Sequence, residues 1–289
     1  MGFTLNYLIF KHKDISKQLL SGLLKTNMSE NSETPPIKET QTEFNAAPAE
    51  SQTERLRPKD VVLQKELLDR LNDETKRKAL AGEGEFWMFL LGKEGQATES
   101  VSVGIGHSWG ISANPEQVIA DLNPWIQKGF SVVADYHNHP QSSAVVYQAY
   151  GFPEAYVTSP SDADLDTDAN SVRGLVLSKL KQNPYPRIIT AYSKSQDKII
   201  LNAFDIKRGI TLDESKMIGF DDPTFIEEEP DELGIQMHAS VFTNPEKLAE
   251  TKAIEFVGIK AVSTNGSIHE VSNNLRDALG KGSPEVSGS

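Results

Sequence analysis

The apolar positions along residues 58–206 switch several times between helical and strand-like spacing. Residues 59–80 carry apolar side chains among charges: Val61, Val62, Leu67, Leu68 and Leu71. This spacing predicts an amphipathic helix, which the glycines after residue 81 would end. Residues 85–91 are apolar on both faces, which is typical of a central strand. Residues 99–105 alternate and predict the next strand.

A second series of elements follows along the chain. Asn114-Pro115 is a good helix start, because a capping side chain precedes a proline in the first turn, and this helix would run to about Lys128. The other predicted elements are a strand over 130–136, a loop over 141–158, a helix from Ser161 to Leu180, and strands over 187–192 and 198–204. Strands that alternate with helices predict an α/β (or α+β) domain over about 58–206, a mixed β-sheet flanked by helices.

The segments outside this domain have different patterns. Residues 207–279 contain an acidic run at 227–232, a short helix after Asn244-Pro245 and a hairpin that turns at Asn265-Gly266. They predict a small α+β extension, either an appendage or a continuation of the main sheet. Residues 1–27 predict a short N-terminal helix or leader. The segments 28–57 and 280–289 are poor in apolar residues, so we expect a disordered linker and a disordered tail.

Composition excludes several classes of function. The formal net charge is −12, from 29 basic and 41 acidic residues, which argues against a nucleic-acid binder and against an anionic membrane surface as partner. No stretch reaches the roughly 18–20 apolar residues of a membrane span. The apolar run at 3–10 lacks a basic lead-in, so we expect no secretory signal and a cytoplasmic protein. Because cysteine is absent, any metal must be held by His, Asp or Glu.

His137 and His139 are the only histidines close together in the sequence, and they follow a predicted strand. Positions i and i+2 of a strand point to the same side, so the two imidazoles can share one zinc ion at about 2.0–2.1 Å. The alternative is a pair of solvated loop histidines. Pro140 fixes the chain direction just beyond them.

Two carboxylates could complete such a site. If Ser161 caps a helix, Asp164 lies in the first turn and can supply a third ligand; the alternative is an ordinary capped helix whose acids favour its dipole. Glu85 opens an apolar strand and could accept a proton at a metal site. The alternative is a strand-end glutamate in solvent, and Glu83, which shares its strand parity, competes for the role.

Together these pieces form a pattern. The sequence has Glu85-Phe-Trp-Met-Phe-Leu-Leu-Gly92, then Tyr136-His137-Asn138-His139-Pro140, then Ser161-Asp162-Ala163-Asp164. In this order they resemble the motifs of the JAMM (MPN+, or JAB) zinc metallopeptidases, a glutamate that opens a strand, His-x-His-Pro and Ser-x-x-Asp. The resemblance covers about residues 85–206.

The sequence departs from this family at two places. Between His139 and Ser161 lie 21 residues, more than is usual in the family, so residues 142–158 would be an aromatic-rich insertion. Met88 stands where the family has a glycine. The insertion leaves the register open, because Ser159 and Asp162 form a second Ser-x-x-Asp. We prefer Ser161 and Asp164, because the residues before and after them also match.

The resemblance implies a cytidine-deaminase-like JAB/MPN domain that binds Zn²⁺ through His137, His139 and Asp164, with water in the open position. Glu85 would be the general base and Ser161 would stabilise the oxyanion. The implied function is hydrolysis of an amide bond in a protein or peptide substrate, as a peptidase or an isopeptidase on ubiquitin-like conjugates. The alternatives are an inactive MPN-type scaffold and a bacterial toxin or effector module.

Overall fold

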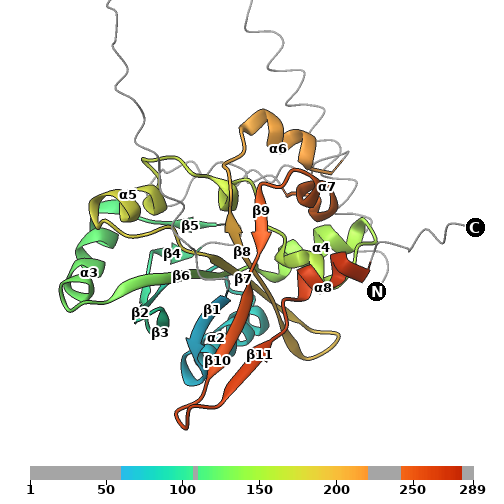
Figure 1. The fold of residues 1–289 in the computed structure, drawn as a ribbon. Coiled ribbons are helices and arrows are strands. Elements are labelled where there is room, and N and C mark those ends of the chain that lie inside the picture. The colour runs from blue at the N-terminus through green and yellow to red at the C-terminus, as the bar shows by residue number, and fades with distance from the viewer. Residues whose placement is uncertain (1–59, 107–109, 221–241, 282–289) are drawn as a thin grey trace, which may run out of the picture. The chain divides into compact units, whose positions relative to one another are not determined.

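The computed structural model describes residues 60–106, 110–220 and 242–281. The predictions for residues 1–27, 28–57 and 227–232, and for most of the tail at 280–289, lie outside the described residues. Within the described ranges the chain forms a mixed α/β structure in which one large sheet is flanked by helices (Figure 1).

The large sheet has nine strands in the order β11-β10-β1-β3-β2-β6-β7-β8-β9. In chain order they are β1 (Asp60–Gln64), β2 (Trp87–Lys93), β3 (Gln96–Ser102), β6 (Ser131–Asn138), β7 (Arg187–Ser193), β8 (Lys198–Ile206), β9 (Ile254–Phe256), β10 (Gly258–Val262) and β11 (Ile268–Val271). A separate short pair joins β4 (Ile105–Gly106) to β5 (Ile111–Ser112). In the large sheet β1 runs parallel to β10 and to β3, and β6 runs parallel to β7.

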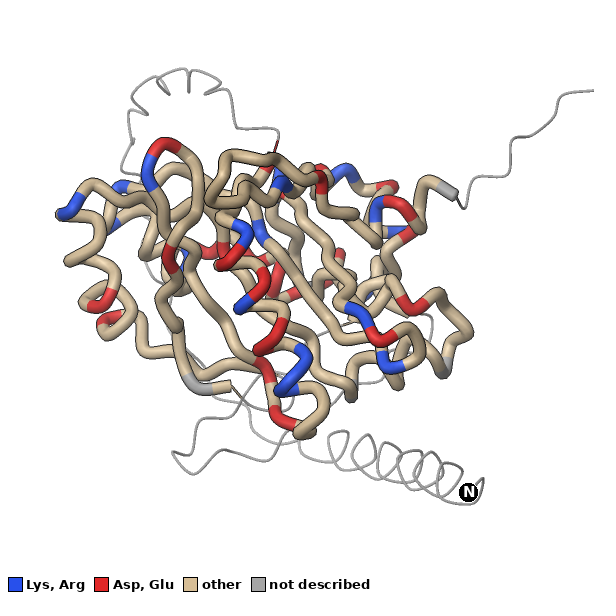
Figure 2. Tube along the Cα trace, turned by 90° about the horizontal axis from the view of Figure 1, so that it is seen from below, with Lys and Arg blue, Asp and Glu red and all other residues tan. Residues whose placement is uncertain are grey.

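Helices and 3-10 turns connect these strands. They are α2 (Lys65–Ala81), α3 (Pro115–Gln127), α4 (Gln141–Ala149), η1 (Glu154–Thr158), η2 (Ala163–Leu165), α5 (Val172–Lys179), α6 (Leu212–Ile218), α7 (Pro245–Glu250) and α8 (Asn274–Lys281). Helix α2 packs its leucines against one side of the sheet, in a core that includes Leu90 and Tyr136. Helices α3 and α5 cover the other side, where Trp87 and Phe89 are buried. Acidic and basic positions are interspersed along α2 (Figure 2).

The sheet curls so that its two ends meet. Strand β9 is the last in the strand order and β10 is the second strand from the other end, yet only Val257 separates them in the chain. The Val257 N–H donates to the carbonyl of Ala203 on β8 at 3.1 Å. Asn273 Nδ2 donates to the carbonyls of Ala203 and Val257, which fixes this junction. Residues after 206 therefore add three strands to the main sheet.

Two predicted elements are wrong in part. The helix expected over 59–80 begins only at Lys65, because residues 60–64 form β1 between β10 and β3. The segment 141–158 was expected as a loop and instead contains α4 and η1, whose aromatic side chains are buried together around Tyr147 and Tyr156. In both cases the deciding contacts come from residues far away in the sequence.

The predicted helix from Ser161 to Leu180 is also wrong. The chain forms only the short turn η2 and then α5, which Ser171 caps by accepting from the Gly174 N–H. Between them, Asp166 and Asp168 each accept a hydrogen bond from the backbone N–H two residues on, at 2.7 and 2.8 Å. Such local side-chain bonds compete with the helical hydrogen bonds and stop the helix.

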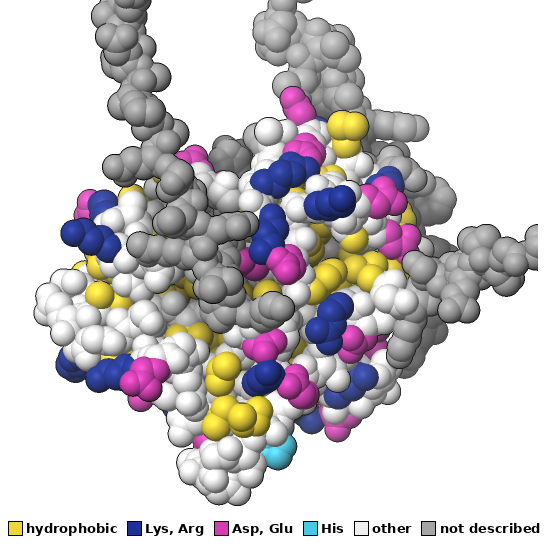
Figure 3. Space-filling view, viewed as in Figure 1, with side chains coloured by type: hydrophobic (Ala, Val, Ile, Leu, Met, Phe, Trp, Pro, Cys, Tyr) yellow, Lys and Arg dark blue, Asp and Glu magenta, His cyan; other side chains and the backbone are white. Residues whose placement is uncertain are grey.

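Other predicted elements are confirmed with small shifts in their ends. Helix α3 is capped by Asn114, which accepts from the N–H groups of Glu116 and Gln117. The strands predicted at 187–192 and 198–204 are β7 and β8, and the C-terminal hairpin is β10–β11. Among the described residues, no helix has the length and apolar character needed to cross a bilayer. The face drawn in Figure 3 mixes basic and acidic side chains with small hydrophobic groups.

Candidate metal centre

The end of β6 holds the two histidines in an extended segment. Asn138 forms two hydrogen bonds with the backbone of Phe86. The Phe86 N–H donates to Asn138 Oδ1 at 2.7 Å, and the Asn138 N–H donates to the Phe86 carbonyl at 3.3 Å. On the opposite edge the His139 N–H donates to the carbonyl of Thr190 at 2.7 Å. Held between β2 and β7 in this way, His137 and His139 point to the same side, with ring centroids 5.3 Å apart.

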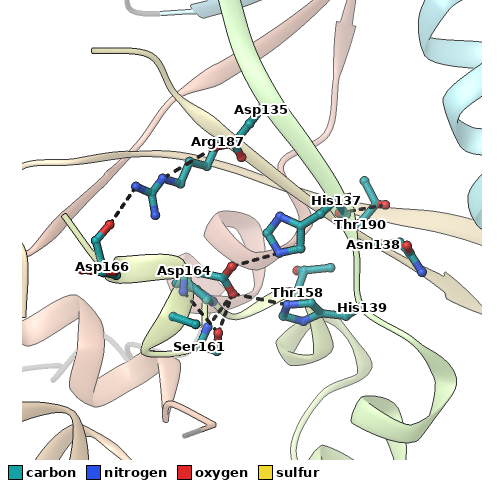
Figure 4. Close-up of polar contacts among 12 residues, drawn as sticks. Asp135, His137, Asn138, His139, Thr158, Ser161, Asp164, Asp166, Arg187 and Thr190 are labelled. Atoms are coloured by element: carbon teal, nitrogen blue, oxygen red, sulfur yellow. Dashed lines mark hydrogen bonds and ion pairs between the residues drawn. The ribbon is translucent and has the colours of Figure 1, made fainter. Parts of the chain in front are cut away.

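Asp164 meets both imidazoles. Its Oδ1 lies 3.1 Å from His137 Nε2 and its Oδ2 lies 3.5 Å from His139 Nε2 (Figure 4). All three residues are buried, and one ligand atom from each lies within 4.8 Å of the others. The structure therefore brings together the three residues that the sequence analysis chose as metal ligands.

Neighbouring groups orient two of the three side chains. The N–H and the Oγ–H of Ser161 both donate to Asp164 Oδ2 at 2.8 Å. His139 Nδ1 lies 2.6 Å from the carbonyl of Val157 in η1. Because a carbonyl only accepts, Nδ1 carries the proton, and in the neutral ring Nε2 is left with its lone pair toward Asp164.

His137 fits a metal ligand for a different reason. Its side chain is buried, yet neither ring nitrogen has a hydrogen-bond partner, and the 3.1 Å approach of Nε2 to Asp164 lacks hydrogen-bond geometry. Buried polar atoms are normally paired, since leaving them unpaired costs free energy. Two imidazoles and a carboxylate are also a ligand set that zinc and similar metals accept. This buried group could therefore bind a metal ion.

The electrostatics of the group couple its members. Burial by itself would lower the pKa of His139, but the hydrogen bond and charge of Asp164, the charge of Glu85 and the Val157 carbonyl together raise it. Burial would raise the pKa of Asp164, but His137 and His139 hold it well below its usual value. Asp164 is therefore an ionised carboxylate at neutral pH.

Glu85 lies at the edge of this group and Glu83 does not. Continuing the β2–β6 pairing from Trp87 with His137 places Glu85 opposite His139, and the charge of Glu85 acts on the pKa of that histidine. Glu83 instead pairs with Arg77 at 2.7 Å and Lys78 at 3.1 Å, which lower its pKa to about 2. Of the two acids considered from the sequence, only Glu85 lies beside the histidines.

The alternative register of the last motif places its residues elsewhere. Ser159 is buried, and its Oγ bonds to Thr243 Oγ1 at 3.0 Å. Asp162 Oδ1 accepts from the Ala163 N–H at 2.8 Å, and the group that could hold a metal contains Asp164 rather than Asp162.

Three further charged residues, which the sequence analysis did not select, lie next to the group. Arg173 Nε donates to buried Asp135 Oδ2 at 2.7 Å, its Nη2 lies 3.9 Å from Asp164 Oδ1, and its guanidinium carbon lies 4.3 Å from the Trp87 ring centroid. Arg187 Nε lies 3.9 Å from the same Asp135 oxygen. Burial, and then the charge of Arg173, lower the pKa of Arg187 to about 10. The sequence signal was Asp135, an acid inside an apolar strand two residues before His137.

No protein-family model matches the sequence, and no curated protein matches it significantly.

Proposed function

We propose that this protein is a zinc-dependent amide hydrolase of the JAMM type, with the JAB/MPN-like, cytidine-deaminase-like arrangement over the region from β2 to β8. One observation carries the proposal: His137, His139 and Asp164 meet in a buried group whose ligand atoms lie within 4.8 Å of one another. The unpaired ring nitrogens of His137 and the position of Glu85 opposite His139 support it.

The roles of the chain's own residues follow from their positions. His137 and His139 would hold the ion through Nε2, and Asp164 through a carboxylate oxygen. A bound zinc ion lowers the pKa of a coordinated water to about 7 and polarises a carbonyl group. Glu85 would take up at its carboxylate the proton that the attacking water loses, and would return it to the nitrogen of the leaving amine.

Ser161 has a first role in orienting a ligand. Its Oγ–H donates to Asp164 Oδ2, which fixes the carboxylate relative to the two histidines. To stabilise the oxyanion of a tetrahedral intermediate, as the resemblance implies, this hydroxyl would have to turn from Asp164 to the substrate. Both roles predict that Ser161 contributes to activity.

The substrate we propose is a peptide or an isopeptide bond in a protein, including lysine-linked conjugates of ubiquitin-like proteins. The inserted segment with α4 and η1 lies beside the site, because Val157 of η1 contacts His139. This segment exposes Val145 (54%) and Tyr150 (39%). Exposed apolar side chains on a segment that reaches the site are suited to contact with a protein substrate.

Zinc content tests the proposal directly. The purified protein should hold one zinc ion per chain, and a chelator should abolish cleavage of a lysine-linked ubiquitin-like conjugate until zinc is restored.

His137→Ala and Asp164→Ala should lose the metal. The matched controls are His269→Ala, at an exposed histidine on β11, and Asp162→Ala, and both should keep it. Retention of zinc by His137→Ala would reject the site. Stoichiometric zinc without cleavage of the conjugate or of a peptide fusion would favour an inactive MPN-type scaffold.

A further inference from the structure

A group of buried polar atoms without hydrogen-bond partners lies behind the candidate metal centre. Among the described residues, these include Trp87 Nε1, Asp135 Oδ1, His137 Nδ1, Tyr185 Oη and Arg187 Nη1. They belong to one neighbourhood, since Trp87 pairs with His137 across β2 and β6, and Asp135 pairs with Arg187 across β6 and β7. Tyr185 packs edge-on against Phe89, which pairs with Asp135.

The two histidines differ in what their Nδ1 atoms meet. His139 Nδ1 has the Val157 carbonyl, which fixes its tautomer, whereas His137 Nδ1 has no partner. For His137 to offer Nε2 to a metal, its proton must be on Nδ1, and that proton requires an acceptor. The indole of Trp87 and the guanidinium of Arg187 only donate. The acceptors in the neighbourhood are therefore Asp135 Oδ1 and the Tyr185 hydroxyl.

Asp135 is the better placed of these two. It lies on the same side of β6 as His137, two residues before it. Its Oδ2 is already engaged by Arg173 Nε at 2.7 Å, so the orientation of the carboxylate is fixed while Oδ1 remains free to accept. In Figure 4, Asp135 lies above the His137 ring and Asp164 lies below it.

We propose that Asp135 is a positioning residue for His137: its Oδ1 accepts a hydrogen bond from one bridging water, which in turn accepts one from His137 Nδ1–H, and this keeps Nε2 unprotonated and directed at the metal. A water between these groups would find its polar partners among the unpartnered atoms named above. Carboxylate–histidine pairs behind a metal ligand are a general way to fix its tautomer. The inference rests on the metal centre proposed above, but the tautomer is a property of the metal-free protein.

Replacing the carboxylate of Asp135 with an amide should change the tautomer of His137. In Asp135→Asn the side-chain oxygen would stay with Arg173, because the guanidinium needs an acceptor, so the NH₂ group would take the place of Oδ1. A donor there no longer accepts from Nδ1–H and favours the tautomer with the proton on Nε2, the atom that the metal needs. Loss of packing alone would not change the tautomer.

The test is nitrogen NMR of metal-free protein with labelled histidine, at a pH that keeps the imidazoles neutral, with His137 assigned from His137→Gln. We expect the Nδ1–H form of His137 in the wild type and the Nε2–H form in Asp135→Asn. Competition with a chelator should show zinc affinity lower by about 10–100-fold in Asp135→Asn. Asp205→Asn, a buried aspartate on β8, is the control and should change neither result.

The outcomes separate the two proposals. The Nε2–H form in the wild type, or unchanged tautomer and zinc affinity in Asp135→Asn, would overturn the role of Asp135. If Asp135→Asn does not fold, the Nε2–H form in the wild type would still overturn the role of Asp135. A wild-type protein with the Nδ1–H form that binds no zinc would support the role of Asp135 and reject the proposed function.

Discussion

In the candidate metal centre, the orientation and tautomer of each imidazole depend on the partner of its second ring nitrogen, Nδ1. His139 has a backbone carbonyl as a partner, supplied by η1, and this contact places the segment with α4 and η1 beside the site. The orientation of Asp164 depends in the same way on Ser161, because the Ser161 N–H and Oγ–H both donate to Asp164 Oδ2. Such supporting contacts decide whether ligands are oriented before the metal arrives.

The base assignment can be tested at a single residue. Glu85→Gln should keep zinc but lower kcat by about 10²–10⁴-fold, because the amide cannot accept the proton of the attacking water. Glu83→Gln is the matched control, since this acid pairs with Arg77 and Lys78 instead. Metal analysis and initial rates on a conjugate substrate check both variants. Equal loss of activity in the two, or full activity in Glu85→Gln, would exclude Glu85 as the base.

Zinc affinity should depend on pH in a defined direction. The pKa of His139 in the metal-free protein is raised above its usual value of about 6.5, while the pKa of Asp164 is well below its usual value. At a pH below the raised pKa of His139, zinc must therefore displace a proton from that histidine. It displaces none from Asp164, which is already ionised. Affinity should fall as pH falls from 8 to 5, by about tenfold per pH unit for each proton displaced. Calorimetry in two buffers of different ionisation enthalpy measures the proton release. Affinity that is independent of pH would contradict the imidazole ligands.

At the scale of elements, β6 organises the site because it lies between β2 and β7. Its register with β2 brings Glu85 opposite His139, and its register with β7 brings Arg187 beside Asp135. The signal for β6 was visible in the sequence as an apolar run before His137. Strand β1 was not visible, because its residues Val61 and Leu63 also fit the helical spacing that continues into α2.

The role of β1 as a core strand gives a stability prediction. Leu63 is fully buried (0% exposed), so Leu63→Ala should lower the free energy of unfolding by about 2–5 kcal/mol. Ile268→Ala on β11, where the side chain is 65% exposed, should change it by less than about 0.5 kcal/mol. Urea denaturation with an unchanged m-value would measure both. A similar small effect in both variants would contradict the position of β1 in the core.

At the scale of the described chain, the C-terminal strands complete the sheet. Strand β10 pairs with β1 in parallel over five residue pairs, and Asn273 ties the junction after β9 to β8. Buried Leu275 of α8 packs in the same core as Tyr147 of α4 and Tyr156 of η1. The region after residue 206 therefore supports both the sheet and the segment beside the metal centre.

Removal of this region should unfold the protein. A chain that ends at Val257 lacks β10, β11 and α8, exposes the edge of β1, and should lose the cooperative urea transition and bound zinc. A chain that ends at Lys281 keeps every described residue of the region and is the control. Circular dichroism and zinc content compare the two. A zinc-binding, cooperatively folded protein that ends at Val257 would show that residues 258–281 are dispensable.

The sequence by itself determined the elements whose signals are local. Asn114 and Pro115 start α3, Asn265-Gly266 turns the C-terminal hairpin, and the spacing of His137 and His139 aligns two imidazoles, because capping, turn geometry and strand alternation act within a few residues. The choice of Asp164 also came from local sequence, through its motif.

Only the tertiary structure decided what depends on distant partners. It made a strand of residues 60–64 through β10, and placed Glu85 rather than Glu83 beside His139. It also placed Asp135, Arg173 and Arg187 behind the histidines. These outcomes are set by pairing and burial between segments that are far apart in the chain, and local spacing carries no information about them.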